Sequence, residues 1–378
     1  MLMCKKNHYC WDLLFVFGLI FCTMTSLRFK GIPIGIGEIL LVIWMIKQWV
    51  LGAVSGSIVI KKNNNFFLFF WFLFFIFLLF GVLTVVLKGI SLPSGFEHDF
   101  WAYMFVFFLC ISLLISERRE STYNKLKLVS IWGTIIFAIL LLWWKNISPN
   151  LGRLSLVYGG VRFSGGAINP NQLALFIVPI PALVIFLLNK KSGIYKRIFL
   201  VVIFGLSLYV GLSIKSDAII GTYILMIIFY LILSLCERLK KQQQLLLIFI
   251  ITIVCFMLFY TSILGNSYHV FVDLFSKLDK DGSRAFLWLK GIKMALETPF
   301  VGGGPGARVV LSPIHSMEAH NTFIDLSLQV GLGGLLLYFV MLIKKYLKIR
   351  QDKYLLIAFL SIIIFSLSHF VLRQPVKS

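Results

Sequence analysis

The stretch FFLFFWFLFFIFLLFGVLTVVL, residues 66–87, contains no charged side chain. An α-helix needs about 20 apolar residues to cross the hydrocarbon core of a bilayer, so this stretch is long enough to be a membrane span. Comparable runs recur along the chain, and we predict eleven spans, at residues 11–27, 32–52, 66–87, 100–116, 126–144, 171–188, 198–214, 217–235, 244–264, 321–343 and 353–371. The sequence therefore predicts an all-α fold, a polytopic transmembrane helix bundle of about 11–12 spans that forms one integral membrane domain over residues 1–378.

The composition excludes a soluble protein of the same length. Hydrophobic residues make up 59% of the chain, charged residues only 13%, and the mean hydropathy is +0.93. A soluble fold cannot bury that much apolar surface, because much of any folded surface still faces water. The six cysteines show no CxxC and no zinc spacing, and no Asp-x-Asp lies near the predicted outer loops. We therefore expect no metal site and no cofactor.

The net charge of +21 reflects short basic clusters between the apolar runs. Stripes of basic residues with exposed aromatics, which are typical of nucleic-acid binding, are absent, so we expect no nucleic-acid partner. Cytoplasmic loops of membrane proteins are rich in Lys and Arg. With the amino terminus in the cytoplasm, that side receives most basic clusters, at residues 5–6, 61–62, 118–127, 189–197, 237–241 and 344–353, and the short external loops receive few.

Two long segments then lie on the external side, residues 145–170 and residues 265–320. Loops of this length between packed spans are uncommon and are often functional. The second loop, between spans nine and ten, contains SRAFLWLKGIKMALETP, residues 283–299, in which apolar residues follow helical spacing. Ser283 can cap this helix and Pro299 can end it. We predict an amphipathic helix that lies on the outer membrane face or on the bundle.

The end of the second loop is EAHNTFIDLSLQVGLGG, residues 318–334, which places His320 and Asn321 at the external end of the tenth span. A lone histidine at such a position is more often an interfacial residue in contact with water and lipid headgroups. The preceding TPFVGGGPG, residues 298–306, could bring the N–H groups of Gly303 and Gly304 close to a ligand, or could simply be a flexible turn. It lacks the GK[ST] ending of a nucleotide-binding loop.

Together these motifs resemble the O-antigen ligase and polymerase family. Members of that family end a large external loop with His-Asn, nine residues and a glycine, which here are His320, Asn321, residues 322–330 and Gly331. They also carry an arginine in the preceding external loop, followed by an Asn-Pro-Asn pattern. RFSGGAINPNQLALF, residues 162–176, supplies both. The resemblance covers residues 150–345.

The resemblance implies transfer of a glycan from an undecaprenyl-diphosphate carrier to an acceptor hydroxyl, outside the cytoplasmic membrane of a bacterium. Guanidinium groups suit the charge that develops on the departing diphosphate. Arg162 and Arg284 are the candidates for this catalytic role, with Arg308 and Lys215 behind them as substrate-binding residues; a helix-end surface charge is the alternative for Arg284. The asparagines of the Asn-Pro-Asn pattern, Asn169 and Asn171, complete the implied substrate-binding set with Gly303 and Gly304.

Histidine titrates near neutral pH, which suits a group that takes the proton of the acceptor hydroxyl. We therefore expect His320 to be the base or to orient the acceptor, and Asn321 to donate a hydrogen bond to substrate. Glu318 is a rival base or a solvated loop carboxylate, while His315 has the pattern of a loop residue. Asp325 lies one helical turn after Asn321 and either orients the site or pairs with a Lys or Ser.

The sequence departs from the family pattern in three places. Many members have Ser-Arg after the seventh span, where this chain has Lys215 and Ser216 within the tight turn IKSDA. The ammonium group of Lys215 supplies a point charge, whereas the guanidinium group of an arginine would supply a planar pair of hydrogen-bond donors. Gln329 stands where an acidic residue is common, and twelve spans are usual where we predict eleven.

The leading hypothesis is a glycosyltransferase that polymerises carrier-linked repeat units into O-antigen or capsular polysaccharide. The alternative is an O-antigen ligase that transfers finished polymer to a lipid A core, and a flippase of lipid-linked sugars is less favoured, because it would want charged residues within several spans. The expected partners are the carrier-linked donor and acceptor glycans and the lipid bilayer. A flippase and chain-length regulator proteins are further candidate partners.

Overall fold

The computed structural model describes residues 2–29, 34–54, 65–89, 91–93, 95–115, 119–190, 193–236, 284–312 and 315–370. Within these residues, eight helices are long and apolar enough to cross a membrane: Ile36–Val54, Asn65–Leu87, Phe96–Ile115, Thr122–Asn146, Pro170–Leu188, Ile194–Ser213, Asp217–Leu235 and Thr322–Ile349. Two shorter apolar helices, Tyr9–Thr23 and Lys353–Ser366, match the first and last predicted spans. The polytopic all-α fold is confirmed, and the predicted span 244–264 lies outside the described residues.

The helices are α1 (Leu2–Thr23), α2 (Ile36–Val54), α3 (Asn65–Leu87), α4 (Phe96–Ile115), α5 (Arg119–Asn146), α6 (Pro170–Ile177), α7 (Ile180–Leu188), α8 (Ile194–Ser213), α9 (Asp217–Cys236), α12 (Arg284–Glu297), α13 (Thr322–Ile349) and α14 (Lys353–Ser366), with a 3-10 turn η1 (Thr25–Leu27). The strands are β1 (Asn150–Leu151), β2 (Leu154–Ser155), β3 (Val157–Tyr158), β4 (Arg162–Phe163), β5 (Val309–Ser312) and β6 (His315–Met317), paired as three antiparallel hairpins.

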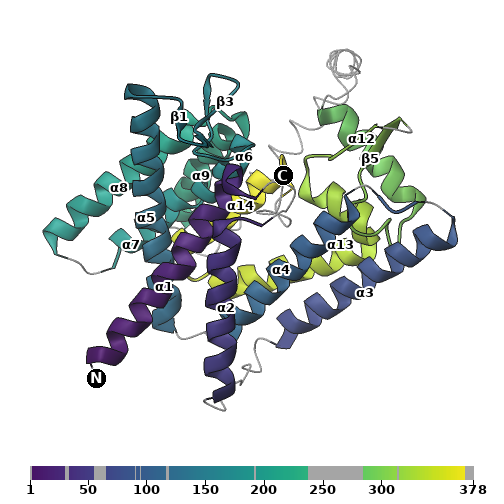
Figure 1. The fold of residues 1–378 in the computed structure, drawn as a ribbon, viewed down its shortest axis with the longest axis horizontal. Helices are drawn as coiled ribbons and strands as arrows, with labels where there is room; N and C mark the ends of the chain where they lie inside the picture. The colour runs from purple at the N-terminus through teal and green to yellow at the C-terminus, as the bar shows by residue number, and fades with distance from the viewer. Residues whose placement is uncertain are drawn as a thin grey trace.

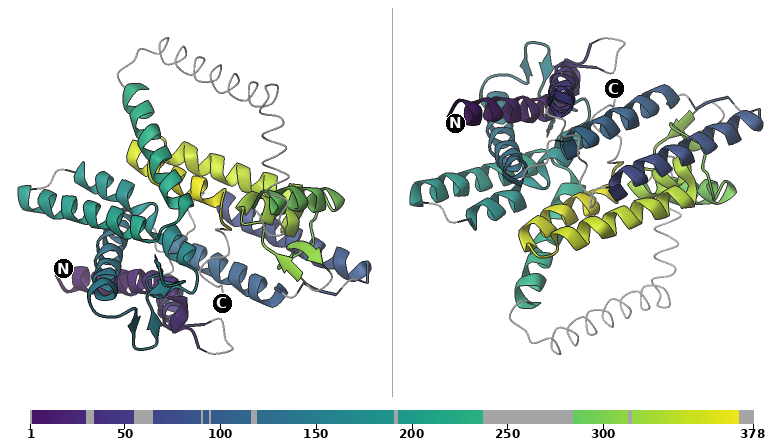
Figure 2. Two further views of the ribbon diagram at one scale, coloured as in Figure 1. Left: turned by 90° about the horizontal axis from the view of Figure 1, so that it is seen from above. Right: turned by 90° about the horizontal axis from the view of Figure 1, so that it is seen from below.

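The helices gather in two groups that lie side by side (Figures 1 and 2). The larger group, α1, α2, α5 to α9 and α14, shares one apolar core that includes Phe137, Leu141 and Ile180. The smaller group packs α3 and α4 against α13 around a cluster of aromatic rings, among them Phe74 and Tyr103, which meet edge to face with their centroids 5.2 Å apart. Contacts between α2 and α4 and between α13 and α14 join the groups.

Helix α3 shows why the quoted stretch is apolar on every side. Its buried face consists of residues at helical spacing, Phe70, Trp71, Phe74, Leu78 and Gly81. Phe72 and Leu79, on the other face, are 63% and 68% exposed. A helix that is hydrophobic all round is stable only where both faces meet an apolar environment, which here means protein on one side and lipid on the other.

The loop at residues 145–170 is more ordered than its sequence suggests. It folds into the two hairpins β1–β2 and β3–β4, which lie beside the start of α6 (Figure 1). The turn η1 holds this loop: the Ser26 hydroxyl donates to the Gly166 carbonyl at 2.6 Å, and the Thr25 hydroxyl accepts from the Ile168 N–H at 2.9 Å. The loop is therefore a fixed platform on the bundle.

The amphipathic helix predicted in the second loop is present as α12, and it packs on the bundle rather than lying free of it. Leu287 is buried with Ile324 and Leu328 of α13. The predicted apolar face is only partly correct, because Leu289 and Leu296 are 56% and 62% exposed. Neither side chain belongs to the apolar cluster that α12 forms with α13.

Gly331 kinks α13, and the glycine-rich turn fills the kink. Gly331 has φ 67° and ψ −175°, and a Cβ there would overlap the backbone of Phe300. The kink frees two carbonyls, and the turn satisfies them, because the Gly303 N–H donates to Leu328 O at 2.7 Å and the Gly304 N–H to Gln329 O at 3.0 Å. The glycine that closes the nine-residue motif is thus required both by a left-handed φ and by close backbone approach.

Candidate functional site

His320 stands in a left-handed turn directly before α13. Its φ is 54°, a region that non-glycine residues rarely adopt and that tertiary contacts must stabilise. Asp325, only 1% exposed, supplies those contacts: its carboxylate accepts from the Ala319 N–H at 2.9 Å and from the Asn321 N–H at 3.3 Å. Asp325 therefore orients the backbone on both sides of His320.

Asn321 is the N-cap of α13 and also a cross-link. Its side-chain oxygen accepts from the N–H groups of Phe323 at 3.0 Å and Ile324 at 3.3 Å. Its amide nitrogen donates to the Leu367 carbonyl, just beyond α14, at 2.9 Å. The side chain therefore joins the start of α13 to the end of α14, a structural role that exists without substrate.

A second histidine, His369, lies next to His320 and was missed by the sequence analysis. The two ring centroids are 6.2 Å apart in an edge-to-face arrangement, and His369 stacks on Phe365 at 4.7 Å. The Thr322 hydroxyl fixes the backbone there by donating to the His369 carbonyl at 2.7 Å. The signal available in the sequence was a histidine near the external end of the last predicted span, 353–371, at the same end of the bundle as His320.

The hairpin β5–β6 brings Arg308 toward this turn. Val309 pairs with Met317 at the open end of the hairpin. Arg308 and Glu318, the next residue outward on each side, therefore lie opposite each other. The Arg308 guanidinium lies against Gly95, at the start of α4, and its buried Nε has no hydrogen-bond partner among the described residues. The side chains of Arg284 and His315 lie outside the described residues.

Gln329, which replaces an expected acidic residue, lies in a buried polar network. The Tyr103 hydroxyl donates to the Gln329 side-chain oxygen, and the Gln329 amide donates to Asp99 at 3.2 Å. All three side chains are at most 1% exposed. A carboxylate is therefore present near this position, but α4 provides it instead of α13.

The other predicted residues form a second group around the turn between α8 and α9. Arg162, in β4, donates from its Nε to the Ile214 carbonyl at 3.2 Å, and no carboxylate of the described residues lies within ion-pair distance of it. Lys215 follows, exposed and with φ 50°. The Ser216 hydroxyl donates to the Asn171 side chain at 3.3 Å, and Asn169 caps α6. Two cations and the Asn-Pro-Asn pattern thus meet in one place.

The two groups lie at the same end of the bundle. Helices α9 and α14 pack together, and Tyr230 near the end of α9 stacks with Tyr354 near the start of α14 at 6.1 Å. Asp217 lies about 20 Å of helix before Tyr230 on α9. Leu367 lies the same distance after Tyr354 along α14. The Lys215 turn and the α14 end that binds Asn321 are therefore both at the far end of this helix pair.

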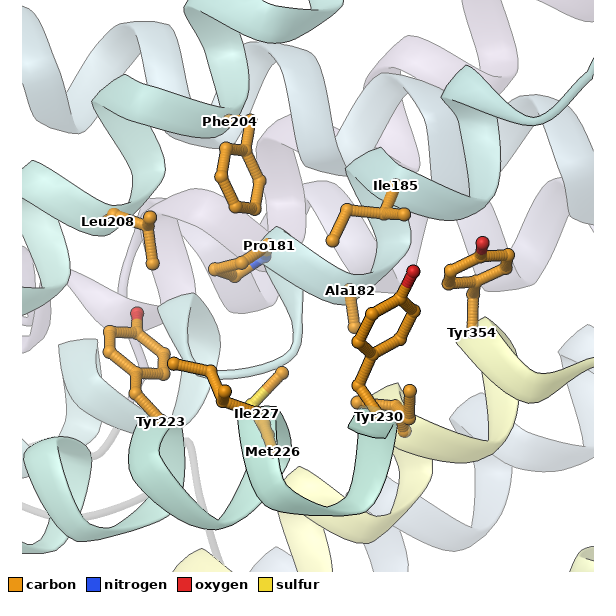
Figure 3. Close-up of a pocket in the computed structure, with 11 residues that line it drawn as sticks. Pro181, Ala182, Ile185, Phe204, Leu208, Tyr223, Met226, Ile227, Tyr230 and Tyr354 are labelled. Atoms are coloured by element: carbon orange, nitrogen blue, oxygen red, sulfur yellow. The ribbon is translucent and has the colours of Figure 1, made fainter. Parts of the chain in front are cut away.

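Figure 3 shows an apolar pocket of about 290 Å³ between α7, α8, α9 and α14. Phe204, Leu208 and Met226 are part of its lining, with Tyr223 toward one end and Tyr354 toward the other (Figure 3). The Tyr223 ring lies against Gly211, where a Cβ would overlap it. Because Gly211 is one helical turn before Lys215, the pocket begins about a turn inward from the cationic group.

Two backbone N–H groups of the glycine-rich turn, which were predicted to bind a ligand, are already hydrogen-bonded within the protein. Both the Gly303 and Gly304 N–H groups are used by the kinked helix α13. Their arrangement is explained by packing alone. No group of three or more His, Cys, Asp or Glu side chains among the described residues could hold a metal ion.

Residues 199–339 match the family model described as O-Antigen ligase. This match supports the O-antigen ligase and polymerase family. The matched segment contains Lys215, Arg308, His320 and Gly331, whereas Arg162 and the Asn-Pro-Asn pattern precede it. No curated protein and no solved structure matches the chain. The eight long apolar helices indicate a multi-pass membrane protein, and the segment 199–339 is similar to the O-antigen ligase family.

Proposed function

We propose that the protein polymerises oligosaccharide repeat units that are carried on undecaprenyl diphosphate. The observation that carries this proposal is the His320 turn, which lies inside the family segment and is held in a strained backbone conformation by Asp325. Backbone strain of this kind persists where the surrounding structure enforces it and is concentrated at functional sites. In the reaction, an acceptor hydroxyl attacks the anomeric carbon of the donor, the carbon–oxygen bond to the diphosphate breaks, and the hydroxyl proton goes to a base.

His320 is the proposed acceptor-side group. Its imidazole takes the proton of the acceptor hydroxyl or orients that hydroxyl for attack. The side chain is partly exposed, unlike His369, which is 5% exposed and packed on Phe365. Glu318, at 9% exposure, is buried rather than solvated and remains the second candidate base.

Arg162 and Lys215 are the proposed donor-side groups. Only the Nε of Arg162 is used by the Ile214 carbonyl, so its two terminal nitrogens remain for an anion. Lys215 adds a second positive charge in the exposed turn next to it. Such groups stabilise the negative charge that develops on a leaving diphosphate. Arg284 and Arg308 remain proposed contributors from the α12 side of the site.

The polyprenyl chain of the carrier requires an apolar groove, and the pocket in Figure 3 provides one. The pocket starts about one helical turn from Lys215. Helices α8 and α9 both line the pocket, and Lys215 lies in the turn that joins them. We therefore place the diphosphate at Arg162 and Lys215, and the first isoprene units of the carrier in the pocket.

A ligase that transfers finished polymer to a lipid A core is the second candidate, because the matching family model is described by that activity. Both reactions break the same donor bond, so the same donor-side residues serve both. The difference is the acceptor, and therefore also the species that accumulates when the reaction stops.

We infer that the site faces the outside of the cytoplasmic membrane. Lys190, after α7, and Arg350 and Lys353, at the connection of α13 to α14, lie at the end of the bundle opposite the His320 turn. Because Lys and Arg collect on the cytoplasmic side of membrane proteins, we infer that this basic end faces the cytoplasm and that the His320 turn faces outward. A reporter enzyme that works only outside the cytoplasm is expected to be active when fused after Gly160, at the tip of the β3–β4 hairpin. The same reporter is expected to be inactive when fused after Gln351, and the reverse pattern would contradict this orientation.

Replacing Arg162 tests the proposed function directly. Arg162→Ala is expected to remove nearly all long-chain polysaccharide, because the leaving diphosphate loses a bidentate partner. Arg162→Lys should keep part of the activity, since an ammonium retains the charge but not the planar fork. The measurement is a gel of surface polysaccharide, together with extraction of carrier-linked glycans, from cells whose own gene is deleted.

The accumulated glycan separates the two candidate reactions. A polymerase defect leaves carrier-linked single repeats, whereas carrier-linked long polymer would identify a ligase. Arg153→Ala is the matched control, because Arg153 is an exposed arginine of the same loop, in the β1–β2 turn. Normal chain lengths from Arg162→Ala at normal membrane abundance would remove Arg162 from the site.

A further inference from the structure

A second groove lies where α5 and α8 begin, at the end of the bundle opposite the His320 turn. It has a volume of about 430 Å³ and lies between α1, α5, α7 and α8. Its floor is apolar and buried, with Leu128, Leu187 and Leu200 contributing to it. Trp132 forms one wall, and its ring is 6.0 Å from Phe17 of α1. The proposed reaction uses none of these residues.

The mouth of this groove is cationic. Lys127 of α5 and Lys196 of α8 line the groove from two helices, and Tyr9 and Tyr123 also line it near the starts of α1 and α5. Ile135, which also lines the groove, follows Lys127 on α5 by about 12 Å of helix. The groove therefore combines two ammonium groups at one end with an apolar channel that extends toward the middle of the bundle.

The two lysines are available to an external anion. The nearby carboxylate of Asp12 is already paired, at 3.1 Å, with the buried Lys125. Asp352, at the start of α14, accepts from the N–H groups of Tyr354 and Leu355. Among the described side chains, no carboxylate lies within ion-pair distance of Lys127 or Lys196.

We propose that this groove binds an anionic phospholipid of the surrounding membrane. The lipid phosphate lies between Lys127 and Lys196, and one acyl chain runs past Trp132 toward Ile135. Basic pockets between transmembrane helices are suited to anionic headgroups, because a lipid phosphate retains its charge at the membrane surface. The apolar channel favours a lipid over a soluble phosphate, which would gain nothing from it. A zwitterionic lipid carries its own cation and gains less from two lysines.

The test measures lipid binding to the purified full chain in detergent by native mass spectrometry. The probes are phosphatidylglycerol, phosphatidylcholine with the same acyl chains, and glycerol phosphate, which has no chains. Phosphatidylglycerol is expected to bind in preference to the other two. Replacing both lysines, Lys127→Gln with Lys196→Gln, should weaken phosphatidylglycerol binding by roughly 30-fold, since each basic residue near an anionic headgroup contributes about a factor of five.

The matched control has the same loss of charge outside the groove: Lys190→Gln with Arg197→Gln. Arg197 neighbours Lys196 on α8 but does not line the groove. This control should bind phosphatidylglycerol as the unchanged protein does. If it lost as much binding as the Lys127 and Lys196 variant, the lipid would be held only by the general positive charge of the protein, and the site would be overturned. Ile131→Phe, which narrows the channel, should weaken binding while both lysines remain. Unchanged binding by a folded Ile131→Phe variant, or tight binding of glycerol phosphate, would equally overturn the proposal.

Discussion

Replacing His320 with alanine is expected to remove long-chain polysaccharide from the cell surface while carrier-linked single repeats accumulate. General-base assistance is worth about 10²–10⁴-fold in rate, which is enough to abolish visible polymer. The loss should come from the imidazole, since the fold around the turn rests mainly on Asp325, Asn321 and Thr322. The measurement is a gel of surface polysaccharide from cells without their own gene, with the membrane abundance of the variant checked in parallel.

Two further variants distinguish the effect of losing the imidazole from the effect of disturbing the backbone turn. Alanine adopts φ 54° less readily than asparagine does, so His320→Asn keeps the turn while removing the base. It should fail as His320→Ala does. His315→Ala, in strand β6 of the same loop, should polymerise normally. Normal chain lengths from well-expressed His320→Ala protein would reduce His320 to an interfacial residue.

Most of the membrane fold could be predicted from apolar run length alone. The predicted span 66–87 and the observed α3, Asn65–Leu87, differ by one residue, because an uncharged run has few positions at which it can meet water. The predicted division between two spans at the α8–α9 turn was also correct. Two charged residues, Lys215 and Asp217, are exposed at this turn and interrupt the apolar sequence. Length and charge are local properties of the chain, and these boundaries depend on little else.

The ordered loop at residues 145–170 could not be predicted in the same way. Each of its four strands has only two residues, too few for an alternating pattern to be recognised. The loop is held by hydrogen bonds to η1, which lies far away in the sequence, and by Leu154 and Phe163, which are buried in the larger core. Arg162 could be selected as a candidate, but its position beside Ile214 depends on those long-range contacts.

The nine-residue spacing of the His-Asn motif now has a physical explanation. Residues 322–330 form the first turns of α13, between the cap at Asn321 and the kink at Gly331. The spacing therefore fixes the distance between the His320 turn and the glycine-rich turn that fills the kink. His369 and Asp99 escaped the sequence analysis because only the tertiary packing of α14 and α4 brings them to α13.

Replacing Asp325 with alanine is expected to lower polymer formation by at least 10²-fold, although Asp325 need not touch substrate. Its carboxylate accepts from the N–H groups on both sides of His320, at 2.9 and 3.3 Å. Removing it leaves two buried donors unsatisfied, at about 1–3 kcal/mol each, and releases a turn whose φ of 54° is unfavourable. His320 would then leave the geometry required for proton transfer, so the effect is one of positioning.

Asp352→Ala provides the comparison that makes this interpretation testable. Asp352 caps α14 with hydrogen bonds of 3.1 and 3.2 Å to two N–H groups, the same chemistry at the end of α14 away from the site. Loss of such a cap costs about 1 kcal/mol, so both variants should melt at lower temperatures than the unchanged protein. Only Asp325→Ala should lose polymer, and Asp325→Asn should fall between the two, because an amide has one accepting oxygen instead of two. Equal loss of polymer in Asp352→Ala would mean that stability, and not the position of His320, limits the reaction.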